Sequence, residues 1–278
     1  MKNVLMLLLA FVILVPSASG QKLKAEEIIA KHLSSIATPE KLSSVKSLIA
    51  VGEVKVDFIT PKNQPTSGRI VLTSQAGKSF FGMQLTAIDY PREMIIFDGS
   101  KTDVAMVRAG TRSSLGNFIQ SNSAIVSQGV MGGTLMTSWN LLAAAQGGAK
   151  ITTSGTRKVN GKEAYVLSIV LKGGSDLDIT MFFDQKNFQH LRTEYKRTSS
   201  AAMGRTIDES ARNSETRIKV TEDFSDHQDY QGIVLPRKYK LYYSISGQNG
   251  TTEIAWTGEF TEFALNPTLD PATFGIKP

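Results

Sequence analysis

The stretch GVMGGTLMTSWNLLAAA, residues 129–145, decides how the whole sequence is interpreted. It is apolar and favours a helix, yet the segments on both sides of it alternate between apolar and polar residues as short strands do. Three glycines, Gly129, Gly132 and Gly133, stand ahead of apolar residues that recur at helical spacing. We therefore expect a hinged helical segment inserted into a β-sheet protein.

The first residues of the chain have the features of an export signal. Lys2 supplies a positive charge, residues 4–15 form an unbroken apolar run, and the small residues 18–20 form a cleavage pattern. The apolar run has about 12 residues, whereas a membrane-spanning helix needs about 20. We expect a signal peptide over residues 1–20, cleavage after Gly20 and a periplasmic protein. The alternative is a retained membrane anchor.

Composition excludes several classes of site. The chain has no cysteine, which rules out disulfides, thiolate metal sites, a cysteine nucleophile and a lipid attached to cysteine. Stability must therefore come from an apolar core, and we expect residues 21–278 to form a single domain. The net charge of +6 is compatible with binding to an anionic membrane surface, but solvated charged faces explain it equally well.

The periodicity of the chain changes from helical to strand-like near residue 48. Residues 24–37 have apolar positions at helical spacing, and Thr38-Pro39 is typical of the start of a second, short helix. From Leu48 onwards the period is two, and Asp98-Gly99 and Asn160-Gly161 are hairpin signals. The pattern predicts ten or eleven antiparallel strands and a few helices, a mainly β (α+β) fold.

Two segments interrupt the strands. A helical insertion is expected over about residues 112–146, and a polar stretch without periodicity, about residues 198–214, is expected to be a mobile loop. The apolar positions of the insertion would cover the sheet as a lid: Leu115, Phe118, Ile119, Leu135, Met136, Trp139 and Leu142.

A long twisted sheet curls, and an apolar concave face must then be covered. Alternation predicts that this face is lined by Ile70, Leu72, Phe81, Met83, Leu85, Tyr239, Leu241, Tyr243, Ile254 and Trp256. The insertion could be a static plug of the core. The glycine hinge and the adaptable side chains of Met131 and Met136 favour instead a lid that moves aside for an apolar ligand.

Residues that could carry catalysis are sparse. The best local cluster is Asp226, His227 and Asp229, and a solvated turn before Gly232 explains it as well. A Ser-x-x-Lys pair at residues 43–46 lacks the further motifs of serine acyl-enzymes. We expect no catalytic residues, no cofactor and no metal site, since His32, His190 and His227 are scattered among predicted helix, strand and turn. Basic residues near the expected loop alternate with acidic ones and lack stacking aromatics, which disfavours nucleic-acid binding.

Both ends of the sequence resemble the LolA/LolB-like superfamily of periplasmic proteins, the carriers that sort outer-membrane lipoproteins. The resemblance lies in AEEIIAKHLSSIATPEKLSSVKSLIAVGEV (25–54), FSDHQDYQGIVLPRKYKLYY (224–243) and FTEFALNPTLDPATFGI (260–276). It implies an incomplete antiparallel barrel of about eleven strands, with helices filling its mouth and an apolar cavity for acyl chains. The insertion would be the lid of that cavity.

The function expected from the sequence is therefore binding rather than catalysis. We predict a monomeric periplasmic carrier for lipid or for the acyl chains of lipoproteins, serving outer-membrane biogenesis together with envelope membrane proteins. The alternative is a non-enzymatic envelope sensor or scaffold that binds a protein partner through an edge strand or the loop. An enzyme would need carboxylates or histidines inside the concave face.

Overall fold

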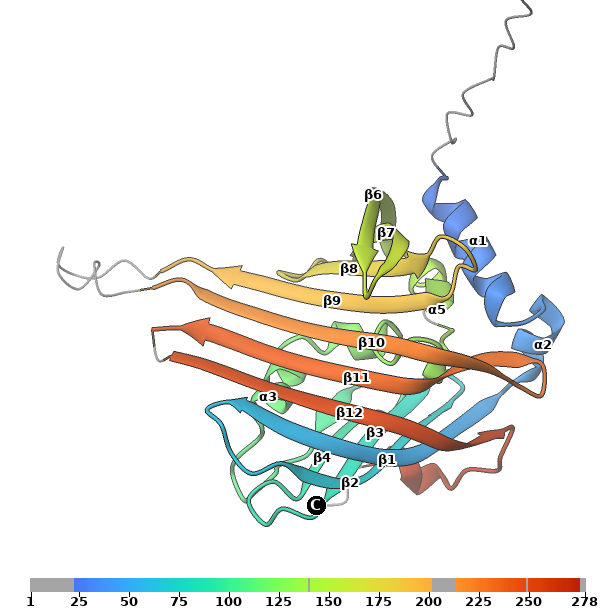
Figure 1. Cartoon of the computed structure of the whole chain (residues 1–278). Coiled ribbons are helices and arrows are strands. Elements are labelled where there is room, and N and C mark those ends of the chain that lie inside the picture. The colour runs from blue at the N-terminus through green and yellow to red at the C-terminus, as the bar shows by residue number, and fades with distance from the viewer. Residues whose placement is uncertain (1–22, 140, 202–213, 249, 276–278) are drawn as a thin grey trace, which may run out of the picture.

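The computed structural model of the chain describes residues 23–139, 141–201, 214–248 and 250–275. Its strands form one antiparallel sheet (Figure 1), in the order β5 (Thr102–Val104), β4 (Arg92–Phe97), β3 (Lys78–Leu85), β2 (Thr66–Gln75), β1 (Ser47–Thr60), β12 (Gly250–Leu265), β11 (Ile233–Gly247), β10 (Thr216–Tyr230), β9 (His190–Ser199), β8 (Asp178–Asp184), β7 (Lys162–Val170) and β6 (Lys150–Val159). The sheet is open, with β5 and β6 at its edges. The prediction of an incomplete antiparallel barrel is confirmed, with twelve strands in the described part instead of about eleven.

Seven helical segments accompany the sheet in the described ranges. They are α1 (Ala25–Ile36), α2 (Pro39–Ser44), α3 (Ser114–Ser121), α4 (Ala124–Ser127), the 3-10 turn η1 (Gly133–Leu135), α5 (Leu141–Gln146) and the 3-10 turn η2 (Pro271–Phe274). No helix of the described part is both long and apolar enough to cross a membrane.

The two N-terminal helices form for the reasons expected from the sequence. The first-turn residues Glu26 and Glu27 of α1 match the helix dipole, and its buried residues include Ile28 and Ile36. The Thr38 hydroxyl accepts the Lys41 N–H at 3.3 Å and so caps α2. Both helices lie at one end of the sheet (Figure 1). Helix α1 lies beside the β8–β9 turn, where His32 hydrogen-bonds to the carbonyl of Phe188, and α2 lies beside the β10–β11 turn.

The sheet order joins the two ends of the chain. Consecutive strands pair with each other except β5 and β6, which do not pair. In addition β1 pairs with β12, so that Val56 lies opposite Trp256. A register shift between β1 and β12 occurs at Val51/Gly52. A Cβ atom on Gly52 would lie 2.1 Å from the carbonyl oxygen of Glu259. Glycine is therefore required at this close approach of the two backbones.

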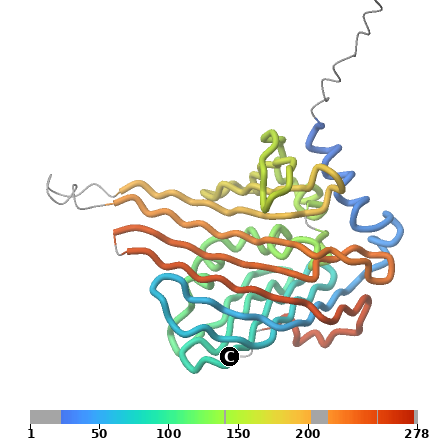
Figure 2. The backbone as a smooth tube through the Cα atoms, viewed as in Figure 1, coloured from blue at the N-terminus to red at the C-terminus, as the bar shows by residue number. Residues whose placement is uncertain are grey.

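The order also explains the inserted helices. Because β5 and β6 are opposite edges of the sheet, the chain between them has to pass from one edge to the other. The tube in Figure 2 shows this connection, in green, behind the middle strands of the sheet. Its helices α3, α4 and α5 and turn η1 lie within the predicted insertion of residues 112–146. We call the sheet face that they cover the concave face.

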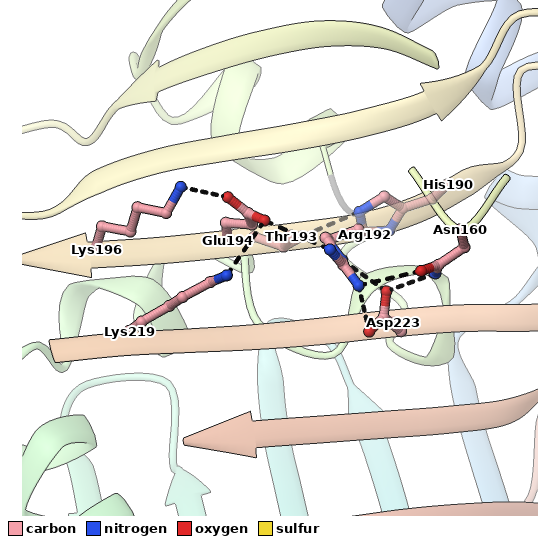
Figure 3. A network of polar contacts seen from close by, with 8 residues as sticks. All are labelled: Asn160, His190, Arg192, Thr193, Glu194, Lys196, Lys219 and Asp223. Atoms are coloured by element: carbon pink, nitrogen blue, oxygen red, sulfur yellow. Dashed lines mark hydrogen bonds and ion pairs between the residues drawn. The ribbon is translucent and has the colours of Figure 1, made fainter. Parts of the chain in front are cut away.

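A network of charged and polar side chains lies on the opposite, outer face of β9 and β10 (Figure 3). The Arg192 guanidinium donates to both carboxylate oxygens of Asp223, at 2.7 and 2.9 Å. Asn160, in the β6–β7 turn, donates to Asp223 at 2.9 Å. Glu194 pairs with Lys196 at 2.6 Å and lies 3.8 Å from Lys219. The network therefore fixes the tip of the β6–β7 hairpin over the outer face of the sheet.

The segment predicted as a mobile loop is described only at its ends. Strand β9 continues to Ser199 and β10 begins at Thr216, so the first residues of the predicted loop belong to a strand. Residues 202–213 lie outside the described residues, as do the predicted signal peptide and its cleavage site after Gly20.

Candidate functional site

The residues predicted to line the concave face lie together in the core. All ten are at most 9% exposed and belong to one apolar cluster. Antiparallel register places them opposite one another: Leu72 faces Phe81 and Ile70 faces Met83 in one half, and Leu241 faces Trp256 in the other. The alternation in the sequence thus assigned the faces of four strands. Contact of these residues with a ligand stays a prediction.

Most residues predicted for the lid pack onto this wall. Leu115, Phe118, Ile119, Leu135 and Met136 are buried in the same cluster as the wall residues. The Phe118 ring meets the Tyr243 ring edge-on, with centroids 6.4 Å apart. In the structure, side chains of the insertion therefore pack over the concave face.

Trp139 and Leu142 occupy a different place. They pack in a second apolar cluster with residues of α1, α2 and the start of β11, which include Ile36, Leu42 and Ile233. A groove of about 500 Å³ opens beside them, lined mainly by apolar side chains of α1 and α2. The end of the insertion thus contacts the N-terminal helices, and this groove adjoins both.

A buried carboxylate connects the glycine hinge of the insertion to the sheet. Glu222, on β10, is fully buried and accepts three hydrogen bonds. The Gly132 N–H and the Tyr239 hydroxyl donate to Oε1 at 2.9 and 2.8 Å, and the Tyr195 hydroxyl donates to Oε2 at 2.7 Å. Burial raises the pKa of Glu222, and the three donors lower it by less. These four residues are called the inner network below.

The backbone of the hinge requires glycine. Gly132 has φ of 86° and Gly133 has φ of 55°, in the left-handed region that other residues seldom adopt. A Cβ atom on Gly133 would lie 2.7 Å from the Phe224 ring and 3.0 Å from Nδ1 of His190. The hinge therefore lies directly on the floor of the concave face.

A second buried carboxyl lies near the start of the insertion. Glu93, on β4, accepts a hydrogen bond from the Tyr90 hydroxyl, which in turn accepts one from the indole N–H of Trp256 at 3.1 Å. Burial raises the pKa of Glu93 to about 7, while the hydroxyls of Ser113 and Tyr90 act in the opposite direction. Sequence reasoning found neither Glu93 nor Glu222, because a lone glutamate in an alternating strand gives no signal of its partners.

The three histidines lie closer together than their positions in the sequence indicate. The His32 ring on α1 donates from Nδ1 to the carbonyl of Phe188 at 2.9 Å, and its centroid lies 6.2 Å from that of His190. Burial lowers the pKa of His32 and of His227 to about 4, and that of His190 well below its usual value. Within the described ranges, no group of three histidine, aspartate or glutamate side chains could hold a metal ion.

The two candidate catalytic patterns have ordinary structural roles in the geometry. The Lys46 ammonium donates to the carbonyl of Ser43 at 2.7 Å rather than to its hydroxyl. Asp229 accepts the Gly232 N–H at 3.0 Å within the β10–β11 turn, and Asp226 lies 3.9 Å from Arg237. Neither pattern places a base beside a nucleophile.

Comparison with known proteins finds similarity of structure alone. No protein-family model matches the chain, and no curated protein matches it. A LolA superfamily protein from Nitrosomonas europaea aligns at a TM-score of 0.48 and 14% identity, over 91% of this chain and 98% of that one. A DUF1329 family protein from Desulfovibrio piger aligns at 0.43 and 10%, over 90% and 97%. MucB of Pseudomonas aeruginosa, solved with MucA, aligns at 0.23 and 9%, over 86% and 99%.

At these identities the likeness concerns the fold alone.

Proposed function

We propose that this protein is a monomeric periplasmic carrier that holds lipid, or the acyl chains of lipoproteins, between the wall of the concave face and the insertion. The observation that carries the proposal is the hinge at Gly132 and Gly133. There an apolar cover joins an apolar wall through a backbone that glycine allows to reorient. The packed structure itself needs glycine here, because of the left-handed backbone and the close approach of Phe224, and the same absence of a side chain would let the cover move as a lid.

Magnitudes set the scale of acyl-chain binding. Each buried methylene contributes about 0.8 kcal/mol, so the fourteen or so methylenes of a common acyl chain contribute roughly 11 kcal/mol. Eleven described side chains of the insertion are buried in the cluster of the wall, and they include Ile125, Val130 and Met131 beside the five predicted lid residues. A single acyl chain would therefore replace only part of this cover.

The test is mass spectrometry of organic extracts of the protein purified from its native periplasm without detergent. We expect stoichiometric phospholipid, fatty acid or acylated peptide. A Glu222→Gln variant, which weakens the hold on Gly132, should release this lipid to acceptor vesicles faster than the wild type. Arg192→Gln, on the outer face of the neighbouring strand, is the matched control and should release it at the wild-type rate.

One observation favours a second function, that of an envelope sensor or scaffold. Side chains of the insertion are buried against the wall, as those of a static core would be. If the purified protein carries no lipid and takes up none, while both variants stay folded, the carrier proposal is contradicted. The scaffold would then be the better account.

A further inference from the structure

A second apolar hollow lies on the outer face of the sheet, away from the insertion. It has a volume of about 1050 Å³ and extends from the β5 edge to the C-terminal turn η2. Phe80 and Met94 lie on its floor, while their neighbours Phe81 and Ile95 point into the core. An adjoining hollow of about 650 Å³ shares Phe80, Met94 and Arg92 with it. Together they form one groove over β1 to β5, called the outer groove below.

The floor of the outer groove depends on a glycine. A Cβ atom on Gly82 would lie 2.5 Å from two atoms of the Phe80 ring, so only glycine lets the ring lie against β3. Phe80 and Met94 are half-buried, and Met106 at the edge is 42% exposed. The groove therefore presents partly exposed apolar surface that a hydrocarbon chain could cover.

Three arginines of the groove, Arg69, Arg92 and Arg112, form no ion pair with any described residue, and two of them are held by a hydrogen bond. Arg92 donates from Nε to the carbonyl of Met106 at 3.3 Å, and Arg112 donates from Nε to the carbonyl of Val104 at 3.1 Å. Each side chain is thereby tethered, while its terminal NH₂ groups form no ion pair with any described residue. A guanidinium fixed in this way presents a planar pair of donors suited to a carboxylate or a phosphate.

The other charges of the groove are already compensated. Arg108 pairs with Asp89 at 2.5 Å, and Asp103 pairs with Lys101 at 2.9 Å. Among the described residues of the groove, the charge left without a partner is thus positive and belongs to Arg69 and the two tethered arginines. An anion fits this balance, whereas a cation would be repelled.

The edge of the sheet disfavours an added peptide strand. Strand β5 has three residues, and the Val104 carbonyl already accepts the hydrogen bond from Arg112. A peptide that paired with this edge would have to displace that side chain.

We propose that the outer groove binds a single-chain lipid with an anionic head, a carboxylate or a phosphate. The chain would lie over Phe80 and Met94, and the head would be bound by Arg92 and Arg112. This site is separate from the concave face and does not depend on the function proposed for it.

The experiment is isothermal titration calorimetry of the delipidated protein with dodecyl phosphate and with dodecanoate, each below its critical micelle concentration. Dodecyl maltoside, dodecyltrimethylammonium and inorganic phosphate alone serve as neutral, cationic and chain-free probes. The variant is R92Q/R112Q. The control is K238Q/K240Q, which removes two exposed positive charges from β11 instead. A photoactivatable dodecanoate then maps the contact by peptide mass spectrometry.

We expect both anionic probes to bind at least tenfold more weakly to R92Q/R112Q and within twofold of the wild type to K238Q/K240Q, with equal thermal midpoints for all three proteins. Cross-links should fall on residues 80–112, and the other probes should bind weakly or not at all. Unchanged affinity in R92Q/R112Q, or cross-links confined to wall residues of the concave face, would overturn the proposal.

Discussion

Two polar networks share strands β9 and β10 but lie on opposite faces of the sheet. The inner network joins Glu222 to the insertion through the Gly132 N–H. The outer network joins Arg192 and Asp223 to the β6–β7 hairpin through Asn160. Each network holds a segment that is distant in the sequence. The two therefore have the same structural role and differ in how deeply their side chains are buried.

The difference in burial indicates which of the two networks contributes more to the free energy of unfolding. Glu222 is fully buried, and its partners would be left without an acceptor if it were removed. The side chains of Arg192 and Asp223 are 21% and 17% exposed, so water can replace their contacts. A buried group left without a partner costs more than a solvated ion pair returns. We therefore expect the inner network, with fewer charges, to contribute more stability.

The largest expected effect is that of Glu222→Ala. It leaves two hydroxyls and one backbone N–H unsatisfied in the core, and we expect a loss of about 3 kcal/mol in the free energy of unfolding. Glu222→Gln keeps an accepting oxygen and should lose about 1 kcal/mol. Urea unfolding measures both. Equal losses for the two variants would show that the acceptor is not what Glu222 contributes.

The second effect in size is expected from acid, which should lower the free energy of unfolding through the buried His32. His32 has an ordinary pKa of 6.5 that burial lowers to about 4, so the unfolded chain takes up a proton before the folded one does. Stability therefore falls as pH falls from about 6.5 towards 4, by roughly 3 kcal/mol for this group. His32→Asn, whose amide can still donate to Phe188, should flatten that fall in urea unfolding at several pH values. Lys31→Gln on the same helix should leave it unchanged.

A smaller effect is expected from the outer network. Arg192→Ala should lower the free energy of unfolding by about 1 kcal/mol, because the bidentate pair with Asp223 is partly solvated. Lys55→Ala, which removes the more exposed pair with Asp57, should change it by less than about 0.5 kcal/mol. If Arg192→Ala cost as much as Glu222→Ala, burial would not explain the difference between the networks.

The smallest effect is expected at the hairpin tip. Asn160 has φ of 49° and donates to Asp223. Asn160→Gly keeps the turn but loses the hydrogen bond, and we expect a loss of about 0.5 kcal/mol in urea unfolding. Asn160→Val should lose more because a β-branched residue is strained at this φ. The reverse order would contradict the assigned turn.

The sequence predicted what local periodicity determines. Alternation assigned the wall faces, the glycines located a left-handed turn within the insertion, and hairpin signals gave the turns between strands. Movement about that turn stays a prediction. Pro236 is informative here, because a proline within a strand is expected at an edge or a bulge, and although β11 is central, its pairing with β12 begins only at Lys238. The proline therefore lies where one side of the strand is unpaired.

Contacts between segments that are far apart in the chain could not be predicted from the sequence. Glu222 and Gly132 are 90 positions apart, and His32 and Phe188 are 156 apart. The position of Trp139 against α1 and α2 likewise depends on how the insertion crosses the sheet. Periodicity assigns a residue to a face but does not name its partner there.

The central claim is that an acyl chain can replace the insertion against the wall, and Trp256 tests it most directly. Trp256 and Trp139 are the two tryptophans of the chain, so Trp139→Phe leaves Trp256 as its sole tryptophan fluorophore. Titration with 12-bromododecanoic acid, which quenches tryptophan on contact, should then quench the fluorescence in a saturable way, and faster in the Glu222→Gln background. Unquenched fluorescence at saturating fatty acid, in a folded protein, would show that the concave face is a permanent core.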